Sequence, residues 1–149
     1  IPERAALELD LRIPPGMDFD AYLDSLRREI GKSVPDAKLE ILEYFPATLS
    51  PLKSPLVAAS AELLKEHIPA AELQPILISG ASDGRFWRRK GTRVYGFSLF
   101  DEKMDRFSTL IHGRDERISG SSMARSFDYF RRLPEAFFRQ WRKGEEKGF

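Results

Sequence analysis

The stretch Pro75-Ile-Leu-Ile-Ser-Gly-Ala-Ser-Asp-Gly84 carries most of the information about the fold. Its first part, residues 75–78, is a short apolar run of the kind found in a strand that is buried on both faces. Its second part is small and polar, and it leads into a predicted short helix at residues 85–90 that Gly91 closes. A second apolar run follows at residues 94–98. Strand, helix and strand in this order predict a parallel α/β layer with a right-handed crossover.

Two further helices are predicted in the same half of the chain. The first runs from residue 55 to residue 67, because Ser54 is a good N-cap and Pro55 a good first helical residue. The second begins near Ser119 and is amphipathic. We expect its core-facing apolar side chains to be Met123, Phe127 and Phe130.

A separate strand–helix–strand unit is predicted at the N-terminal end. Residues 7–13 alternate between apolar and polar, which is typical of a strand with one buried face. Asp18 is a good N-cap for a helix that Gly31 would end, and a second strand is expected at residues 38–44. The predicted apolar stripe of this helix is Phe19, Tyr22, Leu23, Leu26 and Ile30.

A proline-rich linker separates these two parts. Pro46, Pro51 and Pro55 follow one another closely, with Ser50 and Ser54 between them. Clusters of proline and serine interrupt regular structure. We therefore predict one domain at residues 1–46 and another at residues 47–149.

The composition excludes several classes of protein. The 149 residues carry a net charge of +1 and no cysteine, so neither a disulfide framework nor a thiolate metal site is available. No apolar run approaches the roughly 18 residues that cross a bilayer, so we expect no membrane partner and a cytoplasmic location. The sequence opens at Ile1 rather than at methionine, and we interpret it as a processed or partial chain.

The segment Gly80–Arg85 is the first candidate for chemistry. It follows the carboxyl end of a predicted buried strand and opens a helix, which is where open α/β sheets bind ligands. Asp83 is well placed to cap that helix. Arg85 in the first turn opposes the helix dipole at a cost of about 0.3–1 kcal/mol, so a partner is expected. From the residues alone, that partner is either a ligand carboxylate held by two hydrogen bonds or a nearby acid such as Asp101 or Glu116.

The second candidate is Ile111-His-Gly-Arg-Asp-Glu116, which holds one of only two histidines. His112 precedes a glycine and has acids three and four residues later, and imidazole is the commonest metal ligand in proteins. A carboxylate often orients the second ring nitrogen of such a ligand. An ordinary exposed loop histidine would give the same pattern, so both interpretations stay open. For His67, near a helix end, we expect a partly exposed capping contact.

A basic cluster with aromatic neighbours suggests a third possibility, nucleic-acid binding. Arg88–Lys90 and Arg93 stand beside Phe86 and Trp87. These aromatic rings are better used in packing the short helix onto a sheet, and the net charge is nearly zero. We therefore expect a solvated basic face and no nucleic-acid partner.

Taken together, the two candidate motifs and their order resemble a known family. SGASDGRFWRRKG at residues 79–91, VYGF at 94–97 and IHGRDERIS at 111–119 look like the closing stretch of the zinc aminoacylase/carboxypeptidase metallopeptidase family. This family includes glutamate carboxypeptidases, aminoacylases, dipeptidases and succinyl-diaminopimelate desuccinylases. LELDLRIPPG at residues 7–16, with the helix after it, is similar to the second half of the family's inserted lid or dimerisation domain. The resemblance spans about residues 7–138.

The resemblance implies a fold and a set of site residues. Residues 1–46 would be the second half of a ferredoxin-like α+β lid or dimerisation domain. Residues 47–149 would be the C-terminal part of an α/β catalytic domain with a mixed or parallel sheet. His112 matches the last metal ligand, which binds one of two zinc ions, and Arg85 matches the arginine near the free carboxylate of the substrate. Gly84 matches a substrate-binding position, and the supporting residues are Asp83, Gly113, Asp115 and Glu116.

The chain also departs from the family pattern. The sequence has no match to the family's upstream motifs, which are a His-x-Asp, a bridging aspartate and the Glu-Glu pair that supplies the general base; its one Glu-Glu pair, at residues 145–146, follows the His112 motif instead of preceding it. Amide hydrolysis at zinc needs about three protein ligands and an open water position, and it also needs a carboxylate base. We therefore expect this chain to be inactive alone.

Joined to the upstream part of the same polypeptide, the chain would form a hydrolase of peptide or N-acyl amino acid amide bonds. Such an enzyme would use two zinc ions, with cobalt or manganese as alternatives, and would form a homodimer. The alternative is a non-catalytic dimerisation or ligand-binding module of the same fold. Because the predicted strand at residues 7–13 would leave an unpaired edge, we expect the isolated chain to be poorly stable or to self-associate.

Overall fold

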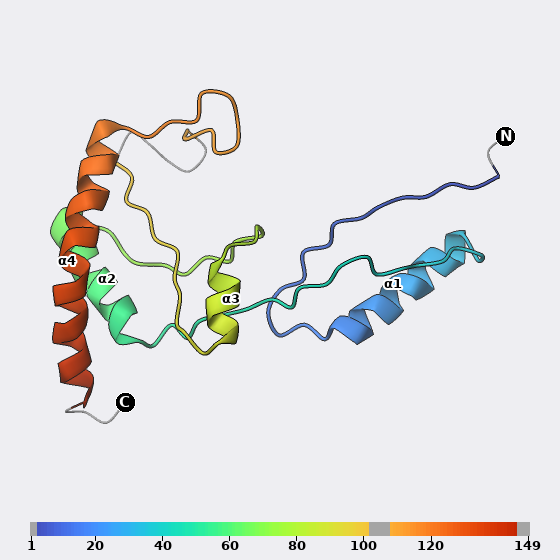
Figure 1. Ribbon diagram of the computed structural model, residues 1–149, viewed down its shortest axis with the longest axis horizontal. Coiled ribbons are helices and arrows are strands. Elements are labelled where there is room, and N and C mark those ends of the chain that lie inside the picture. The colour runs from blue at the N-terminus through green and yellow to red at the C-terminus, as the bar shows by residue number, and fades with distance from the viewer. Residues whose placement is uncertain (1–2, 102–107, 146–149) are drawn as a thin grey trace. The chain divides into compact units, whose positions relative to one another are not determined.

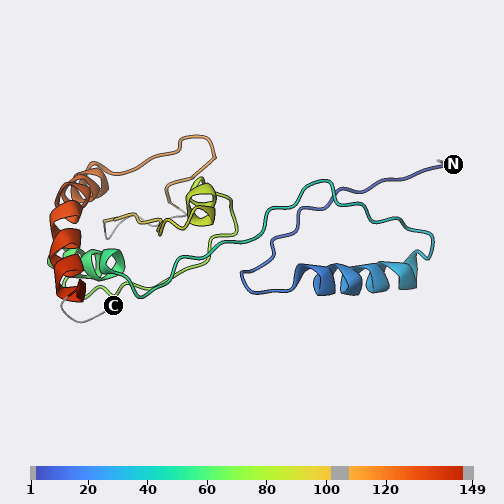
Figure 2. The same ribbon diagram turned by 60° about the horizontal axis from the view of Figure 1, so that its bottom comes forward.

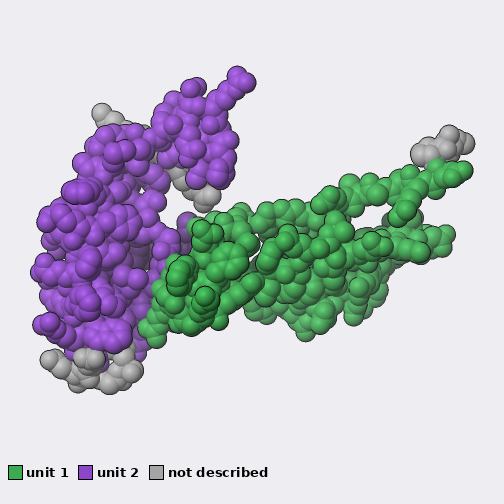
Figure 3. Space-filling view, viewed as in Figure 1, with its two compact units in different colours: residues 1–50, 78–94 green, residues 51–77, 95–149 purple. Residues whose placement is uncertain are grey.

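The computed structural model describes residues 3–101 and 108–145. These residues contain four helices, α1 (Phe19–Ser33), α2 (Pro55–His67), α3 (Gly84–Arg89) and α4 (Gly120–Glu145) (Figure 1). The chain divides into two compact units. The first unit consists of residues 1–50 and 78–94, and the second of residues 51–77 and 95–149 (Figure 3). None of the helices in the described ranges is long and apolar enough to span a membrane.

The segments predicted as strands form no sheet within the described residues. Residues 7–13, 38–44, 75–78 and 94–98 have no regular secondary structure. Several of their apolar side chains are exposed, including Leu7 at 83% and Ile76 at 69%. A strand is stabilised by hydrogen bonds to a neighbouring strand, and these segments have no such neighbour. The helices are thus observed, whereas the α/β layer stays a prediction.

Helix α1 begins as the sequence predicts. The Asp18 carboxylate accepts a hydrogen bond from the Ala21 backbone N–H at 3.1 Å, so it is the N-cap. Leu23 is buried, and the Phe19 ring stacks on the Tyr44 ring with a centroid distance of 3.7 Å. Two members of the predicted apolar stripe of α1, Phe19 and Leu23, are thus packed or buried, as an amphipathic helix requires.

Helix α1 does not end at Gly31 as predicted. It continues to Ser33, and the Val34 N–H donates to the Ile30 carbonyl at 2.8 Å. A glycine inside a helix costs only about 1 kcal/mol relative to alanine, which the continued hydrogen bonding offsets. The prediction of the helix end was wrong for this reason.

The core of the second unit lies between α2 and α4, which lie side by side in both views (Figures 1 and 2). Helix α2 starts as predicted, with Pro55 in its first turn. The Ser54 hydroxyl accepts from the Val57 N–H at 3.2 Å. The buried apolar residues of this core are Ala59, Leu63, Leu64, Leu99, Tyr129 and Ala136.

Helix α4 packs through a different face from the one predicted. Its fully buried residues, Ser122, Tyr129 and Ala136, are spaced seven apart, which places them on one side of a helix. The side chains expected to point inward are exposed, with Met123 at 58%, Phe127 at 71% and Phe130 at 52%. That prediction was wrong because α4 has two apolar faces, and the period alone cannot choose between them.

The contacts of Tyr129 explain why the face of α4 that carries it is buried. Its hydroxyl donates to the Ser60 hydroxyl at 2.7 Å, and its ring stacks on Phe97 with a centroid distance of 4.2 Å. Burial raises the pKa of the Tyr129 hydroxyl. A buried tyrosine is stabilised when its hydroxyl has such a partner.

Charged side chains close the outer edges of the α2–α4 pair. Arg139 and Gln140 both donate to the Glu62 carboxylate, at 2.7 Å and 2.6 Å. The hydrogen bond from Gln140 is the largest single cause that lowers the pKa of Glu62, and the contacts with Arg139 lower it further. Arg132 makes a further ion pair with Glu66. Because these groups are partly exposed, each pair contributes only modestly to stability.

Truncation of two neighbouring aromatic residues of α4 should have very different effects on stability. Tyr129→Ala removes a fully buried ring and should lower the free energy of unfolding by about 3–5 kcal/mol. Phe127→Ala, its control on the same helix, should change it by about 0.5 kcal/mol or less, because Phe127 is exposed. Urea unfolding followed by circular dichroism measures both variants. Equal losses would show that the outer face of α4 is also packed in the isolated chain.

Candidate functional site

The turn before α3 has the expected position but lacks the expected cap. Asp83 has helical backbone angles, φ −61° and ψ −17°, and its side chain makes no capping hydrogen bond. An N-cap needs an extended backbone so that its carboxylate can turn back to the first free N–H groups. Instead, the Arg85 N–H donates to the Ser82 carbonyl at 3.1 Å. The capping prediction for Asp83 was therefore wrong.

Gly84 is explained by close packing at the start of α3. A Cβ added at this position would lie 3.1 Å from Val94 Cγ1 and 3.3 Å from the Ser82 hydroxyl. Both distances are shorter than ordinary van der Waals contact. A side chain here would require Val94 or Ser82 to shift by a few tenths of an ångström, so Gly84 fits a tightly packed corner, and its predicted substrate-binding role stays a prediction.

Arg88 ties α3 to two other segments of the first unit. Its guanidinium donates to the Val94 carbonyl at 2.9 Å, to the Ser50 hydroxyl at 3.1 Å and to the Thr48 hydroxyl at 3.2 Å. The Ser50 hydroxyl in turn accepts from the Val94 N–H at 2.9 Å. Sequence reasoning assigned Arg88 to a solvated basic face and Ser50 to a linker. The contact with Val94 is local, but no local signal could have revealed the contacts with Thr48 and Ser50, because these residues are about forty positions from Arg88.

Arg85 has aromatic rather than acidic neighbours. The carbon at the centre of its guanidinium lies 4.3 Å from the centroid of the Phe45 ring and 4.8 Å from that of Phe86. Its Nε atom is buried and has no hydrogen-bond partner among the described residues. The two acids considered as partners are engaged elsewhere in the second unit, Asp101 with serine hydroxyls and Glu116 with a backbone N–H. Cation–π contact thus holds Arg85 without neutralising its charge.

His112 lies on a tightly turned loop of the second unit. The Gly113 N–H donates to the Leu110 carbonyl at 2.7 Å, and a Cβ at Gly113 would lie only 3.0 Å from that same oxygen. His112 itself has a φ of 63° and Asp115 a φ of 61°, in the left-handed region that non-glycine residues rarely adopt. Glycine at position 113 therefore permits the turn that presents an exposed His112.

Glu116 contacts the backbone of the His112 loop. The Glu116 carboxylate accepts a hydrogen bond from the His112 backbone N–H at 3.4 Å. Within residues 3–101 and 108–145, no group of three or more histidine, aspartate and glutamate side chains is arranged to hold a metal ion. One exposed imidazole does not fit a hydrolytic zinc ion, which needs about three protein ligands. The described residues therefore do not form a complete metal site by themselves.

The predicted site residues fall into two local groups, one in each unit. The corner before α3 brings together Asp83, Gly84 and Arg85 in the first unit. The loop of the second unit brings together His112, Gly113, Asp115 and Glu116. His67 lies apart from this loop, where its Nε2 is 3.5 Å from the Asp128 carboxylate of α4 rather than in the expected capping contact.

The sequence is similar to aminoacylases. Human aminoacylase-1 is 27% identical over 136 residues, which cover 89% of this chain and 32% of that protein. Aminoacylase-1 of Pongo abelii gives the same values, and aminoacylase-1B of Rattus norvegicus is 26% identical over 139 residues, covering 91% and 33%. The chain thus spans about a third of the length of these relatives. The similarity confirms the resemblance to the zinc aminoacylase/carboxypeptidase family that the motifs predicted.

No protein-family model matches the chain. No solved structure matches it either.

Loss of the Arg88 guanidinium should loosen the first unit locally. In Arg88→Ala the Val94 carbonyl and the Ser50 hydroxyl lose a donor, so we expect the Val94 amide hydrogen to exchange about ten times faster or more. Arg89→Ala is the matched control, because Arg89 is exposed on the same helix and should leave this exchange rate unchanged. Amide exchange measured by NMR tests both variants. An unchanged rate in Arg88→Ala would contradict a structural role for this arginine.

Proposed function

We propose that this chain is the C-terminal part of a zinc-dependent hydrolase of the aminoacylase type. The main support is the similarity to aminoacylase-1 over 89% of the chain. The order of the motifs SGASDGR at residues 79–85 and IHGRDE at residues 111–116 agrees with it. The substrate class that follows is an N-acyl amino acid or a peptide, cleaved at its amide bond.

The fold proposed for the complete protein is α/β. Residues 75–78 and 94–98 would join a sheet whose remaining strands come from the upstream part of the polypeptide. Exposure of Ile76, Leu77 and Ile78 supports this, because three consecutive apolar side chains suit a strand covered on both faces. Residues 1–46 would form half of a lid or dimerisation domain, and residues 47–149 would belong to the catalytic domain.

His112 would be one ligand of the zinc site. Its exposure and the tight turn at Gly113 support this role, because both leave the imidazole accessible to a metal held by other ligands. Glu116 would act as a positioning residue through its bond to the His112 backbone N–H, and Asp115 would support the same turn. When bound, zinc would supply an activated water molecule for attack on the amide carbonyl.

Arg85 would bind the free carboxylate of the substrate. Its guanidinium rests on the Phe45 and Phe86 rings and has no acidic partner among the described residues. An arginine with an uncompensated charge can hold a carboxylate through two parallel hydrogen bonds. Asp83 and Gly84 would shape the backbone beside it.

The second candidate function is a non-catalytic module of the same fold, which binds a ligand or a second copy. Exposed apolar side chains on α4, such as Phe127 at 71%, favour it, because exposed apolar surface is typical of an interaction site. The family's His-x-Asp motif and its upstream Glu-Glu motif are not part of this sequence. The two candidates differ in one respect that can be measured. Only the hydrolase predicts that His112 is needed for metal binding in a polypeptide that also contains those motifs.

Replacement of each histidine in turn tests the hydrolase proposal. In the longest natural polypeptide containing this chain, His112→Ala should lower kcat for N-acyl amino acids and dipeptides by at least about 100-fold, because a metal ligand is lost. Zinc content should fall with it. His67→Gln is the matched control and should retain both activity and zinc. Equal activity in parent and His112→Ala would remove His112 from the site, and no activity or metal in the parent would favour the non-catalytic module.

Replacement of Arg85 by lysine should show whether this residue recognises the carboxylate of the substrate. Arg85→Lys keeps the charge but not the two parallel donors, so KM for an N-acyl amino acid should rise about 10-fold or more. Hydrolysis of an N-acyl amine that lacks the carboxylate should be unaffected. Arg93→Lys is the control, and steady-state kinetics on both substrates is the measurement. A parallel loss on both substrates would show that Arg85 does not recognise the carboxylate.

A further inference from the structure

Phe45 contacts the guanidinium of Arg85 from a distant part of the sequence. The central carbon of the guanidinium lies 4.3 Å from the centroid of the Phe45 ring and 4.8 Å from that of Phe86. Phe86 is the next residue along the chain, whereas Phe45 belongs to residues 1–46, the segment predicted to be half of a lid. All three residues lie in the first unit. A residue outside the predicted catalytic domain thus touches the arginine proposed to bind the substrate carboxylate.

Contacts on both sides of Phe45 fix its place in the first unit. The residue before it, Tyr44, stacks its ring on Phe19 of α1 with a centroid distance of 3.7 Å. Shortly after it, the Thr48 hydroxyl accepts a hydrogen bond from the Arg88 guanidinium of α3 at 3.2 Å. A side chain whose neighbours are held by packing and by hydrogen bonds keeps a defined position. The Phe45 ring is therefore suited to orient another group.

An aromatic ring orients a guanidinium without occupying its N–H groups. A carboxylate beside Arg85 would accept hydrogen bonds from it and would compete with a ligand for the same donors. A ring instead attracts the cation through its π face, so the donors stay available. The Nε atom of Arg85 is buried and has no partner among the described residues. The terminal nitrogens are therefore the donors that a carboxylate can reach.

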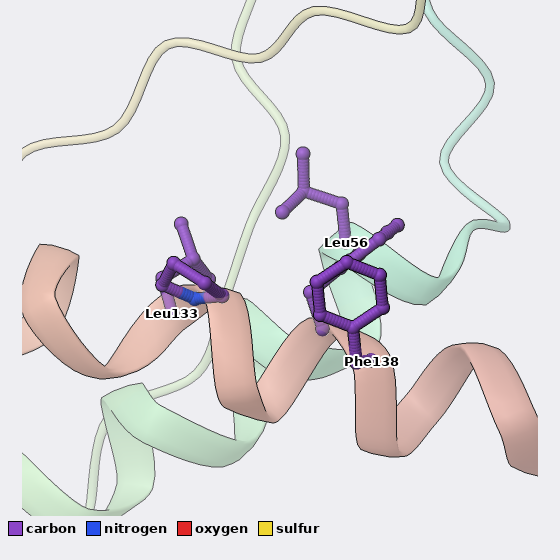
Figure 4. A pocket seen from close by; sticks show the side chains of 5 residues that line it. Leu56, Leu133 and Phe138 are labelled. Carbon is purple, nitrogen blue, oxygen red and sulfur yellow. The ribbon is translucent and has the colours of Figure 1, made fainter.

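The apolar hollow between α2 and α4 offers no alternative site for a carboxylate (Figure 4). A ligand site needs at least one polar group that fixes the orientation of the ligand. The side chains that line the hollow carry no hydrogen-bond donor. They are Leu56, Leu133, Pro134, Phe137 and Phe138. The corner at Arg85, in contrast, has both a positive charge and free donors.

We propose that Phe45 is a positioning residue, whose ring holds the Arg85 guanidinium in the orientation that receives the carboxylate of an N-acyl amino acid. The proposal rests on the proposed function. Phe45 acts through Arg85 and not by contact with the reacting amide bond. Residues 1–46 would thus contribute to substrate specificity in addition to any role as a lid or in dimerisation.

Steady-state kinetics in the longest natural polypeptide containing this chain tests the proposal. Phe45→Leu keeps an apolar side chain but removes the ring, so KM for N-acetylalanine should rise about 5-fold while kcat is unchanged. Phe45→Tyr keeps the ring and should keep the parent KM. Trp87→Leu is the matched control, because the Trp87 ring lies on α3 and contacts Lys90 instead of Arg85. It should leave both constants unchanged.

Three kinetic results would overturn the proposal. The first is an unchanged KM in Phe45→Leu. The second is a rise in KM that Phe45→Tyr shows equally, because the ring would then not be the cause. The third is an equal rise in Trp87→Leu, which would indicate a general effect of losing an aromatic side chain from this unit.

Binding followed at Arg85 itself separates this proposal from the proposed function. In the same polypeptide with zinc removed by a chelator, NMR of the Arg85 Nε–H group reports the guanidinium without hydrolysis. Phe45→Leu should remove the ring-current shift of this resonance and weaken N-acetylalanine binding about 5-fold, and Phe45→Tyr should restore both.

The combined results assign each failure to one proposal. If the parent polypeptide is inactive but shows this binding pattern, the hydrolase fails and the role of Phe45 stands. If the parent hydrolyses N-acetylalanine but Phe45→Leu changes neither KM nor the Arg85 resonance, the role of Phe45 fails alone. An inactive parent that binds no N-acetylalanine at Arg85 would overturn both.

Discussion

The contact of Tyr129 with α2 is the interaction on which the second unit depends. The Tyr129 ring stacks on Phe97, and its hydroxyl bonds to Ser60, so one side chain joins α4, α2 and the segment that carries Leu99. That segment continues to Asp101, whose N–H donates to the Ser122 hydroxyl of α4 at 2.8 Å. Asp101 also contacts Ser119, the residue just before α4. The loop that carries His112 is therefore closed at its base by contacts that depend on the α2–α4 core.

A comparable constraint acts in the first unit. Arg88, Ser50 and Val94 form one hydrogen-bond network. Ser50 and Val94 are also the residues at which the chain leaves this unit. The network thus fixes the two exit points of the chain and the orientation of α3, from which Arg85 projects onto its aromatic neighbours. Both candidate site segments are held by polar contacts that bridge residues far apart in the sequence.

Local signals in the sequence predicted a good part of this arrangement. The Asp18 and Ser54 caps, the starts of α1 and α2 and the relationship to aminoacylases could all be inferred from residues that are adjacent or regularly spaced. The inward face of α4 could not, because both of its faces are apolar and only contacts with residues far away in the sequence, such as Ser60 and Phe97, distinguish them. The end of α1 and the conformation of Asp83 depended on backbone hydrogen bonds that composition does not reveal.

The predicted strands, unlike the helices, were not observed although their sequence patterns are clear. Their apolar patterns are clear, yet a sheet exists only where strands meet, and the described residues of this chain bring none together. The roles of His112 and Arg85 likewise depend on groups that their own motifs do not contain. The sequence pattern can therefore indicate that a segment is suited to form a strand or to bind a ligand. Whether it does so depends on a neighbouring strand or on further ligand-binding residues.

The closed base of the His112 loop has a consequence for how such a protein can evolve. Because Ser119 is held by Asp101, the described part of the loop, residues 108–118, is anchored at the residue just before α4. Within it, the Gly113 N–H donates to the Leu110 carbonyl at 2.7 Å, so an insertion between these two residues would break the turn. Variation that keeps this turn therefore keeps the histidine in its exposed position.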